Sequence, residues 1–323
     1  MADPLAKLSP DQLKRVRKTR QPAWIDPMLA TLTNDYFSDP EWVFEPKLDG
    51  IRCIAFKKGD RVVLLSRNKL DLTAAYIRVA DALRKQEGDF ILDGELAAIE
   101  GDRTSFSLLQ QARHQKVPLA YFVFDIPFVN GSDLRGVDLL GRKAALKAAI
   151  RFKAPLRFVS HIETDGEAYF EEACKRGWEG LIAKRAASTY VKGRTKDWLK
   201  FKCSNEQEFV IGGYTDPQGS RTGFGALLVG YYDNGELLYA GKVGTGFDHE
   251  TLLELLARMK PLERDASPFA GDPPLRKGVH WLKPKLVAQV GFAEWTPDGR
   301  LRHPRFLGLR SDKKARDVVR ERG

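Results

Sequence analysis

The sequence predicts an α+β protein of two domains: a larger N-terminal domain of antiparallel sheets and helices, then a small C-terminal β-barrel. The length of 323 residues leaves room for two domains of ordinary size. Strand-like and amphipathic stretches mix in the first two thirds of the chain, whereas residues 208–243 are dense in glycine. We therefore expect a basic arm over residues 1–21, one domain over 22–204 and a second over 205–323.

The composition is that of a soluble globular protein, with 43% hydrophobic and 30% charged residues. The net charge of +10 and the pI of about 9.4 favour a polyanionic partner, most often nucleic acid. No apolar run approaches membrane-spanning length, so no membrane partner is expected. A targeting peptide would be poorer in acidic residues than the basic arm, which contains Asp3 and Asp11. We therefore expect the arm to be solvated or to contact DNA.

Cys53, Cys174 and Cys203 lie far apart and include no CxxC pair. Their number and spacing predict neither a disulfide framework nor a zinc site. They favour a reducing cytosol, and therefore a cytoplasmic protein.

The elements of the first domain follow from periodicity and from turn signals. Helices are expected where apolar residues recur at helical spacing, at 73–87, 105–115, 140–151 and 166–176. Strands are expected at the short apolar runs 42–46, 51–56, 61–65, 90–92, 95–99, 121–126, 180–183 and 198–202.

The second domain reads as short strands with one helix. Strands are expected at 208–214, 226–232, 236–243 and 286–295, with a hairpin turn at Asp233-Asn234-Gly235. Asp248 is placed to cap a helix over 249–260. This set predicts a small β-barrel of about the size of an OB fold.

Lys47 lies in the segment Phe44-Glu45-Pro46-Lys47-Leu48-Asp49-Gly50-Ile51-Arg52, which reads as a strand, a tight turn and a second strand. A lysine held at a strand end can act as a nucleophile when desolvation and nearby cations favour its neutral amine. Taken alone, the segment fits an ordinary β-hairpin with an exposed lysine better. The rest of the chain has to decide between the two.

Charged residues recur at the ends of the other predicted strands. Strand ends that point the same way can build a site for a charged ligand, and the basic residues among them suit phosphate oxygens. Glu95 and Glu179 could hold Mg²⁺, which prefers carboxylates, water and phosphate. The set comprises Glu45, Lys47, Asp49, Arg52, Arg67, Glu95, Glu179, Lys184, Lys200 and Lys202.

Seven motifs, taken in order, resemble those of the ATP-dependent DNA ligases, which belong to the covalent nucleotidyltransferase superfamily. The resemblance covers residues 22–315 and is greatest to the ligase module of bacterial end-joining ligases. The segments that carry it are Lys47-Leu48-Asp49-Gly50-Ile51-Arg52, Ser66-Arg67-Asn68, Asp93-Gly94-Glu95, Tyr121-Phe122-Val123-Phe124-Asp125, Glu179-Gly180-Leu181, Trp198-Leu199-Lys200-Phe201-Lys202 and Arg302-His303-Pro304 through Gly308-Leu309-Arg310-Ser311-Asp312-Lys313.

The resemblance implies a nucleotidyltransferase (ATP-grasp-like ligase) domain followed by an OB-fold β-barrel. It also implies a reaction in which Lys47 attacks the α-phosphorus of ATP to form lysyl-AMP. AMP then passes to the 5′-phosphate of a DNA nick, and the 3′-hydroxyl displaces it. Each step moves a phosphoryl centre, so catalysis consists mainly of positioning and charge neutralisation.

Roles for the remaining site residues also come from the resemblance. Phe124 is expected to stack on adenine, with Glu45 beside the edge of the base. The metal, Mg²⁺ or Mn²⁺, is assigned to Glu95 and Glu179, and Glu95 also to the ribose. Phosphate and sugar contacts are assigned to Arg52, Arg67, Lys184, Lys200 and Lys202, and orientation of pyrophosphate on closure of the OB domain to Arg302, Arg310, Asp312 and Lys313.

Other interpretations remain at this stage. Singly, Phe124 fits a core position, Lys200 and Lys202 fit a solvated strand face, and Glu95 and Glu179 fit turns. An RNA ligase or a capping-type nucleotidyltransferase shares the lysine motif. A catalytically inactive DNA-binding module would explain the basic charge.

Two positions depart from the family pattern. Lys69 stands where a glycine commonly follows Ser-Arg-Asn, and Gln289 stands where relatives often carry an acid.

We expect a monomer that acts on nicked duplex DNA in repair or recombination by non-homologous end joining. Ku or another end-joining protein is a candidate partner, and the location would be the cytoplasm, at the nucleoid.

Overall fold

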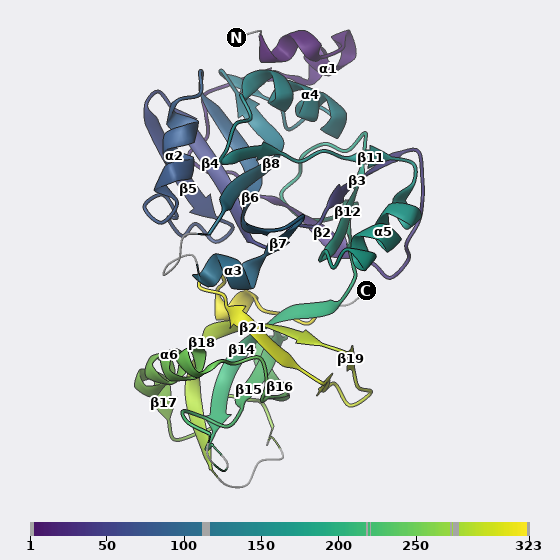
Figure 1. Cartoon of the computed structure of the whole chain (residues 1–323). Coiled ribbons are helices and arrows are strands. Elements are labelled where there is room, and N and C mark those ends of the chain that lie inside the picture. Colours follow the sequence, from purple (N-terminus) through teal and green to yellow (C-terminus); the bar gives the residue numbers. More distant parts are fainter. Residues whose placement is uncertain are drawn as a thin grey trace. The chain divides into compact units, whose positions relative to one another are not determined.

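The computed structural model describes residues 3–111, 117–217, 219, 221–271, 273 and 278–321. The chain forms two compact units, unit 1 over Met1–Cys203 and unit 2 over Ser204–Arg322 (Figure 1). Each unit has its own hydrophobic core. Both mix strands with a few helices, as the predicted α+β class requires.

An eight-stranded sheet forms one half of unit 1. Its main path runs β1-β9-β8-β6-β4-β5, with β10 beside β8 and β7 beside β6. All of its pairs are antiparallel except β10 with β8. The strands are β1 Arg17–Lys18, β4 Ile51–Lys58, β5 Arg61–Ser66, β6 Phe90–Glu100, β7 Arg103–Ser105, β8 Leu119–Val129, β9 Ser132–Asp133 and β10 Leu156–Phe158.

A five-stranded sheet forms the other half, in the order β11-β3-β12-β13-β2. Its pairs are antiparallel except β13 with β2. The strands are β2 Met28–Leu32, β3 Trp42–Pro46, β11 Ile162–Glu163, β12 Gly180–Arg185 and β13 Gly193–Lys202. Burial on both faces explains why β3 and β12 read as continuous apolar runs.

The helices of unit 1 pack against these sheets. Helix α4 begins after Asp138, whose side chain accepts the Gly141 N–H and so caps the helix. It lies against β8, and helix α5 lies against β12 (Figure 1). The helices are η1 Pro4–Lys7, α1 Pro10–Arg15, α2 Ile77–Arg84, α3 Phe106–Gln111, α4 Leu139–Ala149 and α5 Gly166–Lys175. Of the helix expected over 105–115, residues 112–116 lie outside the described part.

The basic N-terminal segment is folded onto unit 1. Leu8 is buried in the core of the large sheet, and β1 pairs with β9 at the edge of that sheet. The Gln12 amide donates to the Asp138 carboxylate on α4. The basic side chains of Arg15, Arg17 and Arg20 remain exposed.

The segment that contains Lys47 crosses from one sheet to the other. β3 belongs to the five-stranded sheet and β4 to the eight-stranded sheet, so residues 47–50 do not form the turn of a hairpin. Strand β6 also differs from the prediction, because it runs without a break through Asp93 and Gly94. Only its register with β8 shifts there, which accommodates the turn-like residues.

Unit 2 is a small closed barrel. Its strands follow the order β16-β15-β14-β18, and β17 and β21 pair with opposite ends of β18 along the edge that faces away from β14. A parallel bridge from Thr245, just after β16, to Arg305 in β21 closes it. The strands are β14 Asn205–Thr215, β15 Leu227–Asp233, β16 Glu236–Val243, β17 Glu263–Arg264, β18 Val279–Phe292, β19 Glu294–Trp295, β20 Leu301–Arg302 and β21 Arg305–Leu309. This is the predicted OB-type barrel.

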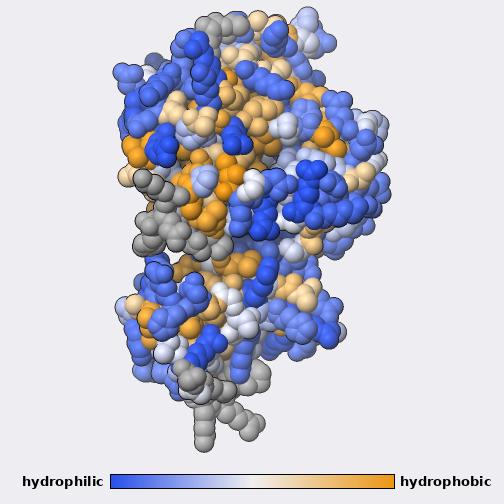
Figure 2. Space-filling model, in the orientation of Figure 1, coloured by the Kyte–Doolittle hydropathy of each residue, from blue (hydrophilic) through white to orange (hydrophobic). Residues whose placement is uncertain are grey.

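Helix α6 (His249–Met259) lies between β16 and β18 in the chain, and Asp248 caps it by accepting the Thr251 N–H at 2.8 Å. Its buried face carries Leu252, Leu255 and Met259. Short 3₁₀ turns follow at η2 Lys260–Leu262 and η3 Ala315–Asp317. Hydrophilic residues cover most of the face seen in Figure 2, with hydrophobic patches among them. Among the described residues, no helix has the length and apolarity needed to cross a membrane.

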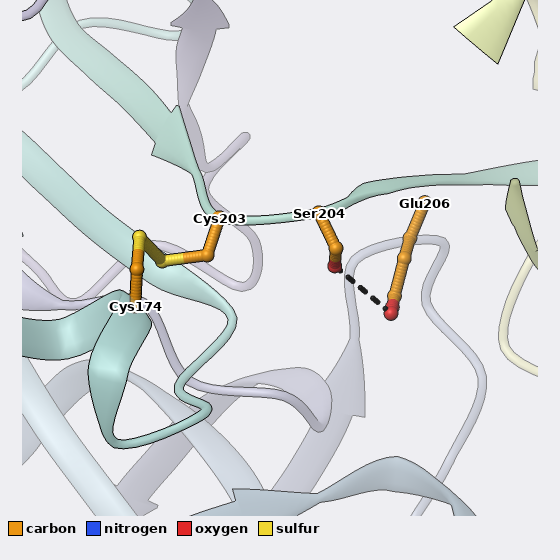
Figure 3. The surroundings of a disulfide bond; sticks show 4 residues. All are labelled: Cys174, Cys203, Ser204 and Glu206. Carbon is orange, nitrogen blue, oxygen red and sulfur yellow. Dashed lines mark hydrogen bonds between the residues drawn. A yellow bond between two sulfur atoms is a disulfide. The ribbon is translucent and has the colours of Figure 1, made fainter. Parts of the chain in front are cut away.

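One disulfide joins Cys174, at the end of α5, to Cys203, just after β13 (Figure 3). The cysteine spacing did not predict it. The pairing depends on the end of α5 packing beside the end of β13, and 29 residues separate the two cysteines in the chain. Cys53 is a buried free thiol.

Candidate active site

Lys47 lies directly after β3, and both its backbone and its side chain are held by neighbouring residues. Its N–H donates to the Gly180 carbonyl at 2.9 Å, which ties it to β12. Its ammonium forms an ion pair with the Glu179 carboxylate. The two side chains are 15% and 10% exposed, so the pair is largely desolvated but reachable from solvent. The predicted nucleophile and a predicted metal ligand are therefore in contact.

The residues after Lys47 are fixed by their neighbours. The Asp49 N–H donates to Thr104 Oγ1 at 2.8 Å, and the Asp49 carboxylate accepts the Phe106 N–H at 2.8 Å. Gly50 has no room for a side chain, because an added Cβ would clash with the Leu96 carbonyl oxygen and approach Glu95 Cγ to 3.1 Å. The turn that orients Lys47 therefore packs directly on β6, which carries Glu95.

Glu45 lies between two lysines in the interior of unit 1. Lys143 donates to its Oε1 at 2.5 Å and Lys184 to its Oε2 at 2.6 Å, and all three side chains are at most 3% exposed. Burial alone would raise the pKa of Glu45, but Lys143 and Lys184 outweigh it and hold the pKa below its ordinary value. This group of three side chains carries a net charge of +1 when fully ionised.

Phe124 and Trp198 form an aromatic wall beside this group. Their ring centroids are 6.1 Å apart in an edge-to-face arrangement. Lys184 Nζ lies 4.3 Å from the Phe124 centroid and 4.1 Å from the Trp198 ring. Burial lowers the pKa of Lys184 to about 8, although Glu45 favours its charged form. Phe124 itself is 8% exposed.

Arg52 is fixed by a buried carboxylate. It donates to both oxygens of Asp93, at 2.5 and 2.6 Å, and to the Met28 carbonyl at 3.0 Å. The Tyr190 hydroxyl donates to the same carboxylate. Burial works against the charge of Arg52, but Asp93 raises its pKa above the ordinary value. The guanidinium lies 4.6 Å from the Phe124 centroid, so it borders the same wall.

Four predicted residues lie on neighbouring strands or strand ends. Glu95 on β6 stands opposite Arg52 on β4. Lys200 and Lys202 on β13 stand opposite Ile182 and Gly180 on β12. Arg67 follows β5, and all four side chains are half-buried. Unit 1 thus places these residues on the strands that carry or border Lys47 and Glu45.

The backbone at Lys69 shows how a lysine is accommodated where a glycine commonly follows Ser-Arg-Asn in the family. Its φ of 65° lies in the left-handed region, which a glycine adopts without strain. Its N–H donates to the Ser66 carbonyl at 2.9 Å, and its ammonium lies 5.1 Å from the Trp24 ring. The loop therefore keeps the backbone shape of a glycine turn with a lysine in place.

The residues predicted to hold a metal fit Mg²⁺ in type but form no complete protein cage. Among the described residues, no three His, Cys, Asp or Glu side chains gather in metal-binding geometry. Mg²⁺ does not need such a cage, because water and phosphate oxygens complete its coordination. The Glu179 carboxylate, in contact with Lys47, has the chemistry for a cation beside the nucleophile.

The predicted residues of unit 2 have partners inside that unit. Arg310 donates to both oxygens of Asp312 at 2.9 Å, and the two side chains are 8% and 3% exposed. Lys313 pairs with Glu208 at 2.8 Å. Arg302 is exposed and pairs with Glu294 at 2.6 Å. The buried Arg310–Asp312 pair therefore stabilises the end of the barrel.

Sequence reasoning missed several partners of these residues. Arg142 and Lys143 occupy buried positions of α4, three and four residues after the buried Leu139. Two cations on the apolar face of a predicted helix were the available signal. Arg142 forms a fully buried pair with Asp125, at 2.8 Å to each carboxylate oxygen.

Comparison with known proteins identifies the family. Residues 27–202 match the family model described as ATP dependent DNA ligase domain, and residues 220–313 match the ATP dependent DNA ligase C terminal region. The chain is 41% identical over 316 residues to the multifunctional non-homologous end joining protein LigD of Pseudomonas aeruginosa, covering 94% of this chain and 38% of that protein.

A second LigD and a solved structure agree with this match. The LigD of Mycobacterium tuberculosis is 39% identical over 303 residues, which cover 91% of this chain and 40% of that protein. The chain thus spans about two fifths of these relatives. A structure of mycobacterial DNA ligase D complexed with ATP and MES superposes with a TM-score of 0.67 at 37% identity, covering 92% of this chain and 98% of that one. The predicted fold is confirmed, and the chain belongs to the ATP-dependent DNA ligase family.

Proposed function

We propose that the chain seals nicks in duplex DNA with ATP, through lysyl-AMP on Lys47 and an adenylated DNA end. The observation that carries the proposal is the placement of Lys47, held between β3 and β12 in contact with Glu179. In this proposal residues 22–204 form the adenylation domain and residues 205–323 the OB-fold domain. RNA ligation and capping are less favoured, because both family models are those of DNA ligases.

The first step needs a neutral amine. Lys47 must release a proton before its nitrogen can attack the α-phosphorus, and the adjacent Glu179 carboxylate can accept that proton and pass it to solvent before a metal ion binds there. A bond then forms from nitrogen to phosphorus, while the bond to pyrophosphate breaks. Mg²⁺ or Mn²⁺ on Glu179 and Glu95 would neutralise phosphate charge in this step.

The next two steps return Lys47 to its starting state. A 5′-phosphate oxygen of the nick attacks the adenylyl phosphorus, the bond from nitrogen to phosphorus breaks, and the Lys47 nitrogen takes up protons from solvent to become an ammonium again. The 3′-hydroxyl then attacks the 5′-phosphorus, its proton passes to solvent, and AMP leaves. Arg52, Arg67, Lys200 and Lys202 supply positive charge for these phosphates, and Phe124 and Glu45 bind the base.

The biological setting is also part of the proposal. LigD relatives are end-joining proteins, which supports a role in double-strand-break repair and a Ku-like partner. The net charge of +10 suits DNA and a position in the cytoplasm at the nucleoid. We propose that the chain acts as a monomer.

Labelled nucleotides test the proposal. Wild type incubated with Mg²⁺ and α-labelled ATP should retain label on the protein and transfer it to nicked DNA, whereas Lys47→Ala should retain none and still bind the nick. Labelling by GTP but not ATP would favour a capping-type enzyme. Sealing of nicked RNA but not nicked DNA would favour an RNA ligase. Absence of any ATP adduct with Mg²⁺ or Mn²⁺ would leave a DNA-binding module.

A further inference from the structure

Lys184 fills the place where the aromatic wall could receive a ligand. Its ammonium donates to Glu45 Oε2 at 2.6 Å and lies within 4.3 Å of both the Phe124 and Trp198 rings. The side chain is 2% exposed, and Phe124 is 8% exposed. A planar base stacked on Phe124 needs the ring face at about 3.5–4 Å. A cation that covers the ring must therefore leave before a base can stack.

Among the described residues, two cations lie near Phe124, and their attachments differ. Arg52 donates to both oxygens of the buried Asp93 and to the Met28 carbonyl. The Lys184 ammonium donates one hydrogen bond within that part of the chain, to Glu45. Burial lowers the pKa of Lys184 to about 8, so its charge is poorly stabilised where it lies. Lys184 is therefore the cation that a ligand can displace at lower cost.

Glu45 remains stable when Lys184 leaves, because Lys143 stays. Lys143 holds Glu45 Oε1 and also donates to the Val159 carbonyl at 2.9 Å. The departure leaves a one-to-one ion pair with a single open acceptor, Oε2. An exocyclic amino group on a stacked base can supply the missing donor. A base with a carbonyl oxygen at that position would place two acceptors together and could not replace the ammonium.

From this arrangement we propose that Lys184 is a gate that selects adenine. In the free protein its ammonium occupies the base site. The adenine amino group takes over Glu45 Oε2, the base stacks on Phe124, and the released ammonium becomes available to the phosphates. This inference rests on the proposed function, since it assumes that ATP is the nucleotide bound. Lys143 acts as a positioning residue that keeps Glu45 in place.

Adenosine separates the gate from a phosphate contact, because it has a base but no phosphate. In Lys184→Ala the shortened side chain no longer reaches the base site, so adenosine should bind roughly tenfold more tightly than to wild type, as measured by calorimetry. ATP should gain less than adenosine, since the variant also lacks the ammonium for the phosphates. Lys147→Ala is the matched control, because Lys147 lies over the Phe158 ring at 4.7 Å, outside this site. Adenosine affinity in Lys184→Ala equal to or weaker than that of wild type would overturn the gate.

A measurement on wild type does not depend on the variant. Lys184 is buried in the free protein and should react slowly with an amine-acylating reagent, as should Lys143. Adenosine should increase modification of Lys184, read by peptide mass spectrometry, and leave Lys143 protected. Unchanged or reduced modification of Lys184 would refute the gate. Failure of wild type to form an ATP adduct would instead refute the proposed function, so the two failures are distinguishable.

Discussion

Replacement of Glu45 by glutamine tests the buried group of charges most severely. The substitution keeps the shape of the side chain but removes the negative charge with which Lys143 and Lys184 both form ion pairs. Removal of one partner from a buried ion pair costs about 3–5 kcal/mol. Lys184 can relieve part of the strain by losing its proton, since burial already lowers its pKa to about 8 and removal of the Glu45 charge lowers that pKa further. Most of the cost therefore falls on Lys143.

The assay is thermal or urea unfolding of the full chain, followed by tryptophan fluorescence. With a loss of about 3–5 kcal/mol, the melting temperature of unit 1 should fall by roughly 6–20 °C. Lys184→Met is the comparison, because it leaves the Glu45–Lys143 pair intact and should cost less than about 1.5 kcal/mol. An unfolding free energy of Glu45→Gln within 1 kcal/mol of the wild-type value would contradict this role of Glu45. A lower unfolding free energy for Lys184→Met than for Glu45→Gln would contradict it equally.

Three further variants or conditions test other parts of the structure. Arg310→Ala removes the guanidinium that pairs with the buried Asp312 carboxylate and should destabilise unit 2 by about 3–5 kcal/mol in urea unfolding, whereas a loss below 1 kcal/mol would contradict the buried pair. Reduction of Cys174–Cys203 should lower the unfolding free energy of unit 1 by about 3–4 kcal/mol, to the level of Cys174→Ser, and an unchanged urea midpoint would exclude this contribution. Burial would raise the pKa of Asp125, but Arg142 holds that pKa below its ordinary value in the folded protein. The ionised Asp125 therefore stabilises the fold above about pH 4, and this stabilisation is lost as the pH falls through the lowered pKa of the folded state. Asp125→Asn should therefore be less stable at pH 7 and lose less stability below pH 4, and an acid limb as steep as that of wild type would count against the pair.

The strand ends were predictable because their chemistry is local in sequence. Lys47 and Glu179 each stand next to a short apolar run, and Lys200 and Lys202 alternate with apolar residues. Both patterns are typical of strands. The second part of the chain was predictable as a barrel, because its apolar runs are short and the turns between them are rich in glycine. These features depend on few long-range contacts.

The partners of the site residues could not be predicted in the same way. Lys143 reaches Glu45 across 98 residues of sequence, and Arg52 meets Asp93 across 41. Such pairs depend on how α4 packs on β8 and how β4 pairs with β6. The path of residues 47–50 between two sheets was mistaken for a hairpin turn for the same reason. An Asp-Gly turn signal fixes the local backbone but not the sheet that the next strand joins.

The central claim is that the Lys47 amine is the group that carries AMP. Wild type should be incubated with ATP and Mg²⁺, digested, and mapped by mass spectrometry under conditions that preserve a phosphoramidate. We expect one adenylyl group on the peptide that contains Lys47, released when nicked DNA is added. An adenylyl group on any other residue, or an unmodified Lys47 peptide in protein that seals nicks, would contradict it.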